Sequence, residues 1–277
     1  MTQYNKYAFV LLHFGDKIKY FEYELYFIKM LRKFSGSNID LIYMAMQDDT
    51  INSTPQFFIE TMKKYFDRVI TVPGIPIDSG YKSHYSHFNT LLTCNFINAY
   101  KLINYDKVCI IESDMIITEN ISDIFNLPVP STYFLNNNSH DPTIDSPING
   151  GILLFKPSWY AWYKSLSLLP DLIAINAKYP NEELFIRTWK HINQLPQRYN
   201  YSHYLLRKIK QTDKLPTIVH LHETKWKALD IIRNNYTNKF SAKIRVVKYF
   251  SKNFYEKYNK EIEAIIIEAQ KLAIMHN

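Results

Sequence analysis

The first 111 residues alternate short apolar runs with longer amphipathic segments, and this alternation limits the fold more than any other feature. The apolar runs have strand length: Tyr7 to His13, Ile39 to Met46, Arg68 to Val72 and Lys107 to Ile111. The segments between them have helical spacing: Ile18 to Phe34, Ser53 to Phe66 and about His87 to Ile103. A strand-helix repeat of this kind predicts an α/β fold with a mostly parallel central sheet and helices on both faces.

The segment Ser53-Thr54-Pro55 is expected to start the second helix, with Ser or Thr as the N-cap and Pro55 in the first turn. In open sheets with this order, ligands gather at the carboxyl ends of the strands. The sequence therefore directs attention to the residues that follow each apolar run.

The composition is that of a compact globular chain. Its 277 residues are 47% hydrophobic, with 6 glycines and no flexible linker. Cys94 and Cys109 lie in helical and apolar segments and are interpreted as small buried hydrophobes. The N-terminal residues lack an apolar signal segment, and no apolar run has the length of a membrane span. We therefore expect a soluble, cytoplasmic protein.

The net charge of +7 is compatible with nucleic acid, an anionic surface or a phosphorylated small substrate as the partner. The basic residues are spread from Lys6 to Lys271 with aromatics between them, and they form no nucleic-acid-binding arm. The distribution argues against nucleic acid and leaves a small anionic substrate open.

Two carboxylates follow the apolar run that ends at Ile111: Glu112 and Asp114, with Ser113 between them. Like charges this close stay ionised together only with water or a cation nearby. A hard divalent ion that bridges to phosphate oxygens would satisfy both. The alternative interpretation is a polar turn that caps a strand, since an acid-x-acid triplet alone is a weak signal.

Three later segments carry candidate site residues. Asn149-Gly150-Gly151 opens an apolar run, where glycines let the backbone approach a ligand and Asn149 can both donate and accept hydrogen bonds, although an ordinary glycine turn has the same pattern. Leu195-Pro196-Gln197-Arg198-Tyr199-Asn200 would by itself be an unremarkable loop. His220 follows the run Ile218-Val219, where a lone histidine is more often a packed residue than a ligand.

Taken in order, these segments resemble the glycogenin-like retaining glycosyltransferases, family eight of the glycosyltransferases. The resemblance covers about residues 7 to 227 and rests on these stretches: Phe66 to Val72, Glu112 to Phe125, Ile148 to Pro157, Leu195 to Asn200 and Ile218 to Trp226. It implies a single GT-A (Rossmann-like) domain and a metal-dependent transfer of glucose or galactose from a UDP-sugar to a glycan, protein or other hydroxyl acceptor. Family members often form dimers, so a homodimer is one expected state.

The resemblance also implies roles for individual residues. Glu112, Asp114 and His220 would hold Mn²⁺, or alternatively Mg²⁺, against the diphosphate of UDP-glucose or UDP-galactose. Lys225 would contact that diphosphate. The remaining donor-site candidates are the stacking residues after the first strand and the residues around the acidic triplet and the glycine pair, namely His13, Phe14, Tyr20, Ser113, Asn149 and Gly150.

Several positions depart from the family pattern. Glu112 stands where the family usually has Asp, and the segment Ser86 to Thr90 lacks the family's basic residue, for which Lys82 is a candidate replacement. The family's D-Q pair appears as Asn181-Glu182. We hypothesise that Glu182 lies beneath the anomeric carbon and stabilises positive charge there. The alternative is that Glu182 and Glu183 only open a helix, where carboxylates favour the positive end of the dipole.

The domain organisation predicted from these patterns is a GT-A domain over residues 1–230 and a helical extension over residues 231–277. Ile262, Ile265 and Ala269 give the extension an apolar face that would pack on the domain or on a partner, while its basic face could instead meet a membrane.

Three other functions fit parts of the pattern. A phosphatase with a D-x-D motif needs an aspartyl nucleophile where this chain has Glu112. A sugar nucleotidylyltransferase needs a glycine-rich basic loop after the first strand, which Leu12 to Lys17 hardly provides. A degenerate nucleotide-sugar binding protein without turnover is consistent with the departures from the family pattern.

Overall fold

The computed structural model of the chain describes residues 6–47, 53–75, 90–135, 148–210, 212–222, 229–230, 232–233 and 241–275. Lys82, His87, Lys225 and Trp226, which belong to the sequence motifs above, lie outside these residues.

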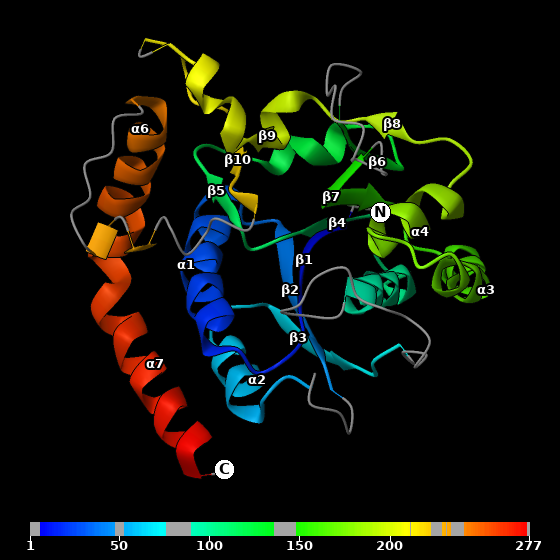
Figure 1. The fold of residues 1–277 in the computed structure, drawn as a ribbon, viewed down its shortest axis with the longest axis horizontal. Coiled ribbons are helices and arrows are strands. Elements are labelled where there is room, and N and C mark those ends of the chain that lie inside the picture. The colour runs from blue at the N-terminus through cyan, green and yellow to red at the C-terminus, as the bar shows by residue number, and fades with distance from the viewer. Residues whose placement is uncertain are drawn as a thin grey trace, which may run out of the picture.

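The main sheet has seven strands in the order β3-β2-β1-β4-β7-β6-β8 (Figure 1). Their bounds, in chain order, are β1 Tyr7–His13, β2 Ile39–Met46, β3 Arg68–Val72, β4 Lys107–Ile111, β6 Ser131–Phe134, β7 Ile148–Phe155 and β8 Asn193–Gln194. The four strands predicted from the apolar runs are parallel neighbours, which confirms the α/β class. The other half departs from parallel order, because β7 runs antiparallel to both β4 and β6.

A second, three-stranded sheet consists of β5 Met115–Ile117, β9 Tyr201–Ser202 and β10 Ile218–His220. β10 pairs antiparallel with β5 and parallel with β9. This small sheet follows directly on β4, so it joins the centre of the main sheet to segments much later in the chain.

Helices cover both faces of the main sheet. Their bounds are α1 Ile18–Phe34, α2 Gln56–Met62, α3 Trp159–Ala174, α4 Pro180–Thr188, α6 Ser241–Phe250 and α7 Glu256–Met275. Other helical segments are η1 Thr90–Lys101, η2 Ser122–Asn126, η3 Gln197–Tyr199, η4 His203–Lys208 and the π-helical turn η6 Ser251–Tyr255.

Two helices differ from the prediction. Pro55 is itself the N-cap of α2, and the hydroxyl of Thr54 donates to the carbonyl of His13 at 3.3 Å instead of capping the helix. The helix predicted over about residues 87–103 is a 3₁₀ helix, η1, within the described residues. Its Asn95 and Asn98 side-chain amides donate to the carbonyls three residues earlier, at 2.9 and 3.2 Å, and so compete with the α-helical pattern.

Alternation along β1 builds two cores, one on each side of the sheet. Phe9 and Leu11 join the core beneath α1, whereas Ala8 and Val10 join the core formed with η1, α3 and α4. Both faces are thus buried, as near-continuous apolar runs in parallel strands require. Figure 1 shows α1 on one side of the sheet and α3 and α4 on the other.

The C-terminal helices α6 and α7 lie beside α1 (Figure 1). Phe250 stacks on Tyr23 and meets Tyr26 edge-on, with ring centroids 6.0 and 5.7 Å apart. Ile262 is fully buried and Lys29 forms an ion pair with Glu261 at 3.0 Å. Across the part of the chain that the structure describes, no helix has both the length and the apolar character needed to cross a membrane.

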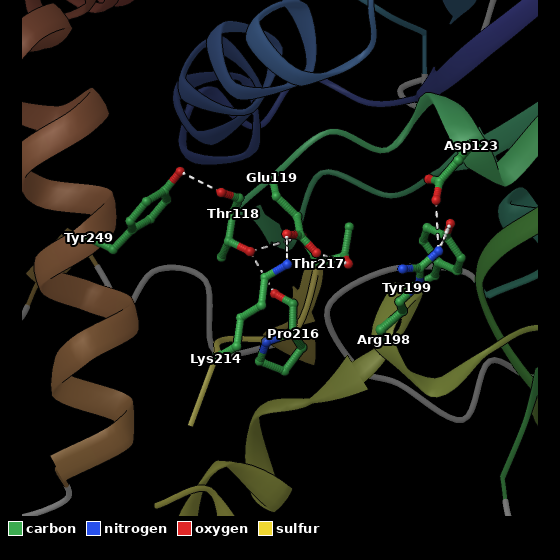
Figure 2. Close-up of polar contacts among 9 residues, drawn as sticks. All are labelled: Thr118, Glu119, Asp123, Arg198, Tyr199, Lys214, Pro216, Thr217 and Tyr249. Atoms are coloured by element: carbon green, nitrogen blue, oxygen red, sulfur yellow. Dashed lines mark hydrogen bonds and ion pairs between the residues drawn. The ribbon is translucent and has the colours of Figure 1, made fainter. Parts of the chain in front are cut away.

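A cluster of polar contacts, which we call the clamp, holds the β5–β10 pair at one end (Figure 2). It comprises Thr118, Glu119, Lys214, Thr217 and Tyr249. Lys214 forms an ion pair with Glu119, and the hydroxyl of Thr217 donates to the same carboxylate at 2.6 Å. The hydroxyl of Tyr249, from α6, donates to the carbonyl of Thr118 at 3.0 Å. The clamp therefore ties the strand that carries His220 to β5 and to the C-terminal helices.

Candidate active site

The fold brings Glu112, Asp114 and His220 together through two strand pairings. At the end of β4 the amide of Glu112 donates to the carbonyl of Gly151 in β7 at 3.0 Å. Directly after Asp114, Met115 of β5 pairs with His220 of β10. The histidine thus arrives beside the carboxylates at the carboxyl end of a central parallel strand, which is where open α/β sheets bind ligands.

The three side chains form a compact donor set. His220 Nε2 lies 3.2 Å from Asp114 Oδ1 and 3.7 Å from Glu112 Oε2. One ligand atom from each residue lies within 4.8 Å of the other two. The side chain of His220 is 3% exposed, that of Asp114 13% and that of Glu112 42%, so the set opens to solvent on the Glu112 side. Two carboxylates and one imidazole suit a divalent ion such as Mn²⁺.

Asn200 orients the imidazole from behind. Its side-chain oxygen lies 2.9 Å from His220 Nδ1, and its amide nitrogen donates to Asn149 Oδ1 at 2.9 Å. Because the Asn200 oxygen accepts, Nδ1 of the neutral ring carries the proton and Nε2 turns its lone pair toward the carboxylates. Asn200 is 2% exposed, and its position in a loop gave no sign of this role beyond the resemblance.

Charges around His220 also control its protonation. Burial lowers its pKa, but the carboxylates of Asp114, Glu112 and Glu182 outweigh burial, so the pKa lies above the ordinary value. A proton and a metal ion would therefore compete for Nε2.

His222 packs on His220, with ring centroids 4.0 Å apart and planes 20° from parallel. Burial and the neighbouring His220 lower the pKa of His222 to about 3, so this ring is neutral at physiological pH. Its Nε2 lies 3.1 Å from the hydroxyl oxygen of Ser202, and its φ of 48° is unusual for a residue with a side chain. Two histidines spaced two residues apart at the end of an apolar run are the sequence signal for this stacked pair.

The glycine pair in β7 makes room for site side chains. A Cβ on Gly151 would lie 2.5 Å from His220 Cε1, and one on Gly150 would lie 2.6 Å from the Asn181 amide nitrogen. The protein's own side chains thus lie close to this pair, and the approach of a ligand to its backbone stays a prediction.

Glu182 and Glu183, adjacent in the first turn of α4, have different partners. Glu183 forms an ion pair with Arg187 one helical turn later, at 2.7 Å, as on an ordinary helix surface. Glu182 turns toward β7 and accepts from the amide of Gly150 at 2.8 Å. Of the two acids, Glu182 therefore belongs to the site.

Asn149 serves the network around His220. Its side-chain oxygen accepts from the amide of Gly151 at 3.1 Å and from Asn200 at 2.9 Å. That oxygen is therefore committed to protein partners.

Of the three stacking candidates at and after the end of β1, His13 is buried, whereas Phe14 and Tyr20 are partly exposed. His13 is 3% exposed and is enclosed by Tyr43 and Phe58, so it is not placed as a stacking surface for a base. Phe14 and Tyr20 are half-buried and keep that candidacy. Ser113 is buried between the two acids.

Comparison with known proteins rests on structure. No protein-family model matches the chain. The uncharacterised protein R707 of Acanthamoeba polyphaga mimivirus is 22% identical over 227 residues, which are 75% of this chain and 76% of R707. The glycosyltransferase GlyE of Streptococcus pneumoniae TIGR4 superposes with a TM-score of 0.58 at 16% identity, over 98% of this chain and 64% of GlyE.

The galactosyltransferase LgtC, in complex with donor and acceptor sugar analogues, superposes with a TM-score of 0.59 at 12% identity, over 91% of this chain and 99% of LgtC. The chain has the GT-A glycosyltransferase fold. The bifunctional glycosyltransferase WbbM is a further neighbour, with a TM-score of 0.50 at 13% identity, over 89% of this chain and 52% of WbbM. At these sequence identities the structural similarity establishes the GT-A fold alone.

Proposed function

We propose that this chain is a metal-dependent retaining glycosyltransferase of the glycogenin-like family that moves glucose or galactose from a UDP-sugar to a hydroxyl acceptor. The observation that carries the proposal is the donor set of Glu112, Asp114 and His220 at the carboxyl end of β4 in a GT-A fold. Structural neighbours that are glycosyltransferases, one of them in complex with donor and acceptor sugar analogues, support the reaction class.

The chemistry of the donor set fits Mn²⁺, with Mg²⁺ as the alternative ion. Asp114 and His220 are the inner donors because they are the least exposed, and Glu112 stands at the open side, where it can also meet the donor's ribose. When bound, the ion would neutralise charge on the diphosphate as UDP leaves. Asn200 holds His220 in the tautomer that such an ion needs.

The rest of the donor would lie along the same sheet edge. Phe14 and Tyr20 are the candidates for stacking on the base, and Lys225 for meeting the diphosphate. The amide nitrogen of Asn149 and the backbone at Gly150 are the candidates for the sugar. The positive net charge of the chain favours approach of an anionic donor.

Glu182 is the candidate for stabilising positive charge at the anomeric carbon. Retention requires that the acceptor oxygen bonds to the face from which UDP departs, either through an enzyme nucleophile or through a tight ion pair. The hydrogen bond from the amide of Gly150 holds the Glu182 carboxylate in place. Full turnover by Glu182→Gln would exclude this role.

The deciding experiment measures UDP release from a panel of UDP-sugars, with Mn²⁺ or with EDTA. It uses the wild type, Asp114→Ala and the control Asp123→Asn, since Asp123 is an exposed carboxylate paired with Arg198 in Figure 2. We expect metal-dependent release from one sugar that Asp114→Ala loses and Asp123→Asn keeps. UDP binding without release, in the presence of a broad acceptor panel, would indicate a binding protein without turnover. Absence of both binding and release would refute the proposal.

A further inference from the structure

A buried polar cluster sits at the end of β1, where the surrounding sheet is apolar. His13 Nδ1 lies 2.8 Å from both carboxylate oxygens of Glu24, a residue of α1 that is 4% exposed. The hydroxyl of Tyr43, in β2, donates to the same carboxylate at 3.1 Å. The other ring nitrogen, Nε2, lies 3.0 Å from the carbonyl oxygen of Gly15.

The partners fix what the ring does. A carbonyl oxygen can only accept, so Nε2 of His13 carries a proton. Nδ1 lies against the carboxylate of Glu24, so the ring is held between that carboxylate and a backbone carbonyl. One ring thus joins α1 to the backbone of the segment that leaves β1.

This segment, Phe14 to Lys17, turns at Gly15, whose φ is 84°. It lies at the same sheet edge as the acidic triplet, because β1 and β4 are parallel neighbours and Val10 pairs with Ile110. The carbonyl of His13 itself accepts from the hydroxyl of Thr54, just before α2. His13 therefore anchors the start of the β1–α1 segment to α1 and to the approach to α2.

Burying a histidine and a carboxylate together is not an efficient way to stabilise a core. A buried ion pair recovers little more than the cost of removing both charges from water, and apolar residues of similar volume often serve stability equally well. What the pair provides that an apolar core does not is a fixed hydrogen bond to one backbone carbonyl.

We propose that His13 is a positioning residue for nucleotide binding, which holds the Phe14–Lys17 segment in the shape that receives the nucleobase. This rests on the proposed function. It assigns to His13 a role through the loop instead of direct stacking, and it makes Glu24 and Tyr43 part of the nucleotide site without contact with the nucleotide.

Two substitutions separate the anchor from the ion pair. The amide nitrogen of asparagine takes roughly the place of Nδ1 and that of glutamine roughly the place of Nε2. His13→Asn therefore keeps a donor toward Glu24 and loses the bond to Gly15, whereas His13→Gln does the reverse. If either variant fails to fold because Glu24 has lost the imidazole as its partner, it is remade together with Glu24→Gln.

The full-length variants are compared by calorimetric titration with UDP in the presence of Mn²⁺, by hydrogen exchange of the Phe14–Lys17 amides, and by thermal unfolding. We expect His13→Asn to weaken UDP binding about tenfold, the equivalent of one well-formed hydrogen bond, and to speed exchange in the loop. His13→Gln should stay within about threefold of wild-type affinity although it is the less stable variant.

Folded His13→Asn with wild-type UDP affinity would overturn the inference and leave the proposed function standing. Loss of affinity in both variants, in proportion to their loss of stability, would also overturn it, since that pattern belongs to a residue that only supports folding. A wild type that fails to bind UDP would refute the proposed function and this inference together.

Discussion

The carboxylates at the two ends of the β5–β10 pair have different kinds of partner. At the clamp end, Glu119 receives the ammonium of Lys214 and the hydroxyl of Thr217. At the site end, Met115 pairs with His220, and the carboxylates of Glu112 and Asp114 both lie close to the imidazole of His220. The same pair of strands thus carries a matched charge at one end and a gathering of like charges at the other.

The contrast separates structural from functional acids. The clamp is a partly exposed ion pair with a supporting hydroxyl, an arrangement worth little to stability and of no use to a ligand. At the site end Asn200 sets the tautomer that keeps the imidazole able to accept, so a cation added there would meet three donors at once.

The largest expected effect is a metal-dependent gain in thermal stability. At a concentration one hundred times its dissociation constant, Mn²⁺ should stabilise the fold by about 2.7 kcal/mol, which is roughly 5 °C for a chain of this size. Asp114→Asn should lose this shift. Glu119→Gln, the matched change at the clamp end, should keep it. Differential scanning fluorimetry with Mn²⁺ and with EDTA measures both, and equal shifts in the two variants would remove the distinction.

The second effect concerns the space that glycine leaves beside His220. Gly151→Ala puts a methyl group 2.5 Å from His220 Cε1 and 2.7 Å from Met115 Cε, so the imidazole has to move. We expect a loss of about 1–3 kcal/mol of stability from overpacking and a roughly tenfold or greater loss of Mn²⁺ affinity. Urea unfolding and Mn²⁺ titration give the two values.

The control for this variant is Gly36→Ala. Gly36 has a φ of 80°, so alanine there is strained as well, but its neighbours are Asn38 and Ser122, outside the site. It should lower stability and leave Mn²⁺ affinity unchanged. Parallel losses of metal affinity in both variants would mean that general destabilisation, not displacement of His220, explains the effect.

The fold was largely readable from local patterns. Apolar runs of the right length fixed the bounds of β1, β2, β3 and β4, because buried parallel strands need apolar side chains on both faces. The antiparallel β7 was not predictable in this way, since direction depends on how the chain returns to the sheet. The start of α2 was missed for a similar reason: Thr54 is drawn to the carbonyl of His13, a tertiary contact, instead of to its own helix.

The candidate site was predictable in part. Glu112 and Asp114 were recognisable because they directly follow a buried strand. Their proximity to His220 depends on the register of β5 with β10, which no local sequence pattern specifies. Only the order of segments in the family resemblance placed His220 with them. The contact of Asn200 with His220 and the interior position of His13 could not be predicted from local patterns. Hydrogen bonds between residues far apart in the chain produce no periodic pattern in the sequence.

A smaller effect is expected from the residue behind the imidazole. Asn200→Asp keeps an oxygen for His220 Nδ1 and loses the donor to Asn149. The added negative charge favours the imidazolium, so Mn²⁺ affinity should fall about tenfold at pH 6 and less at pH 8, where the proton competes weakly. Titration of Mn²⁺ at the two pH values checks this, and an equal loss at both would show that the lost hydrogen bond, and not the charge, dominates.

The smallest effect belongs to the clamp. Hydrogen bonds from Lys214 and Thr217 hold the pKa of Glu119 below its ordinary value. A carboxylate with a lowered folded-state pKa contributes stability that is present above its unfolded-state value, about 4.3, and is lost as pH falls through the folded-state value. Glu119→Gln should therefore cost under about 1 kcal/mol at pH 7, as expected of a partly exposed pair, and the cost should shrink as pH falls below about 4.3.

Urea unfolding of the wild type and Glu119→Gln across this pH range measures the difference. UDP release and Mn²⁺ affinity of the variant should match the wild type at pH 7, because other bonds join β5 to β10 at this end, including that from the hydroxyl of Thr118 to the carbonyl of Pro216 at 2.6 Å. A loss of metal affinity in this variant would show that the two ends of the β5–β10 pair are mechanically coupled. The site would then depend on the matched charge at the clamp as well as on its own residues.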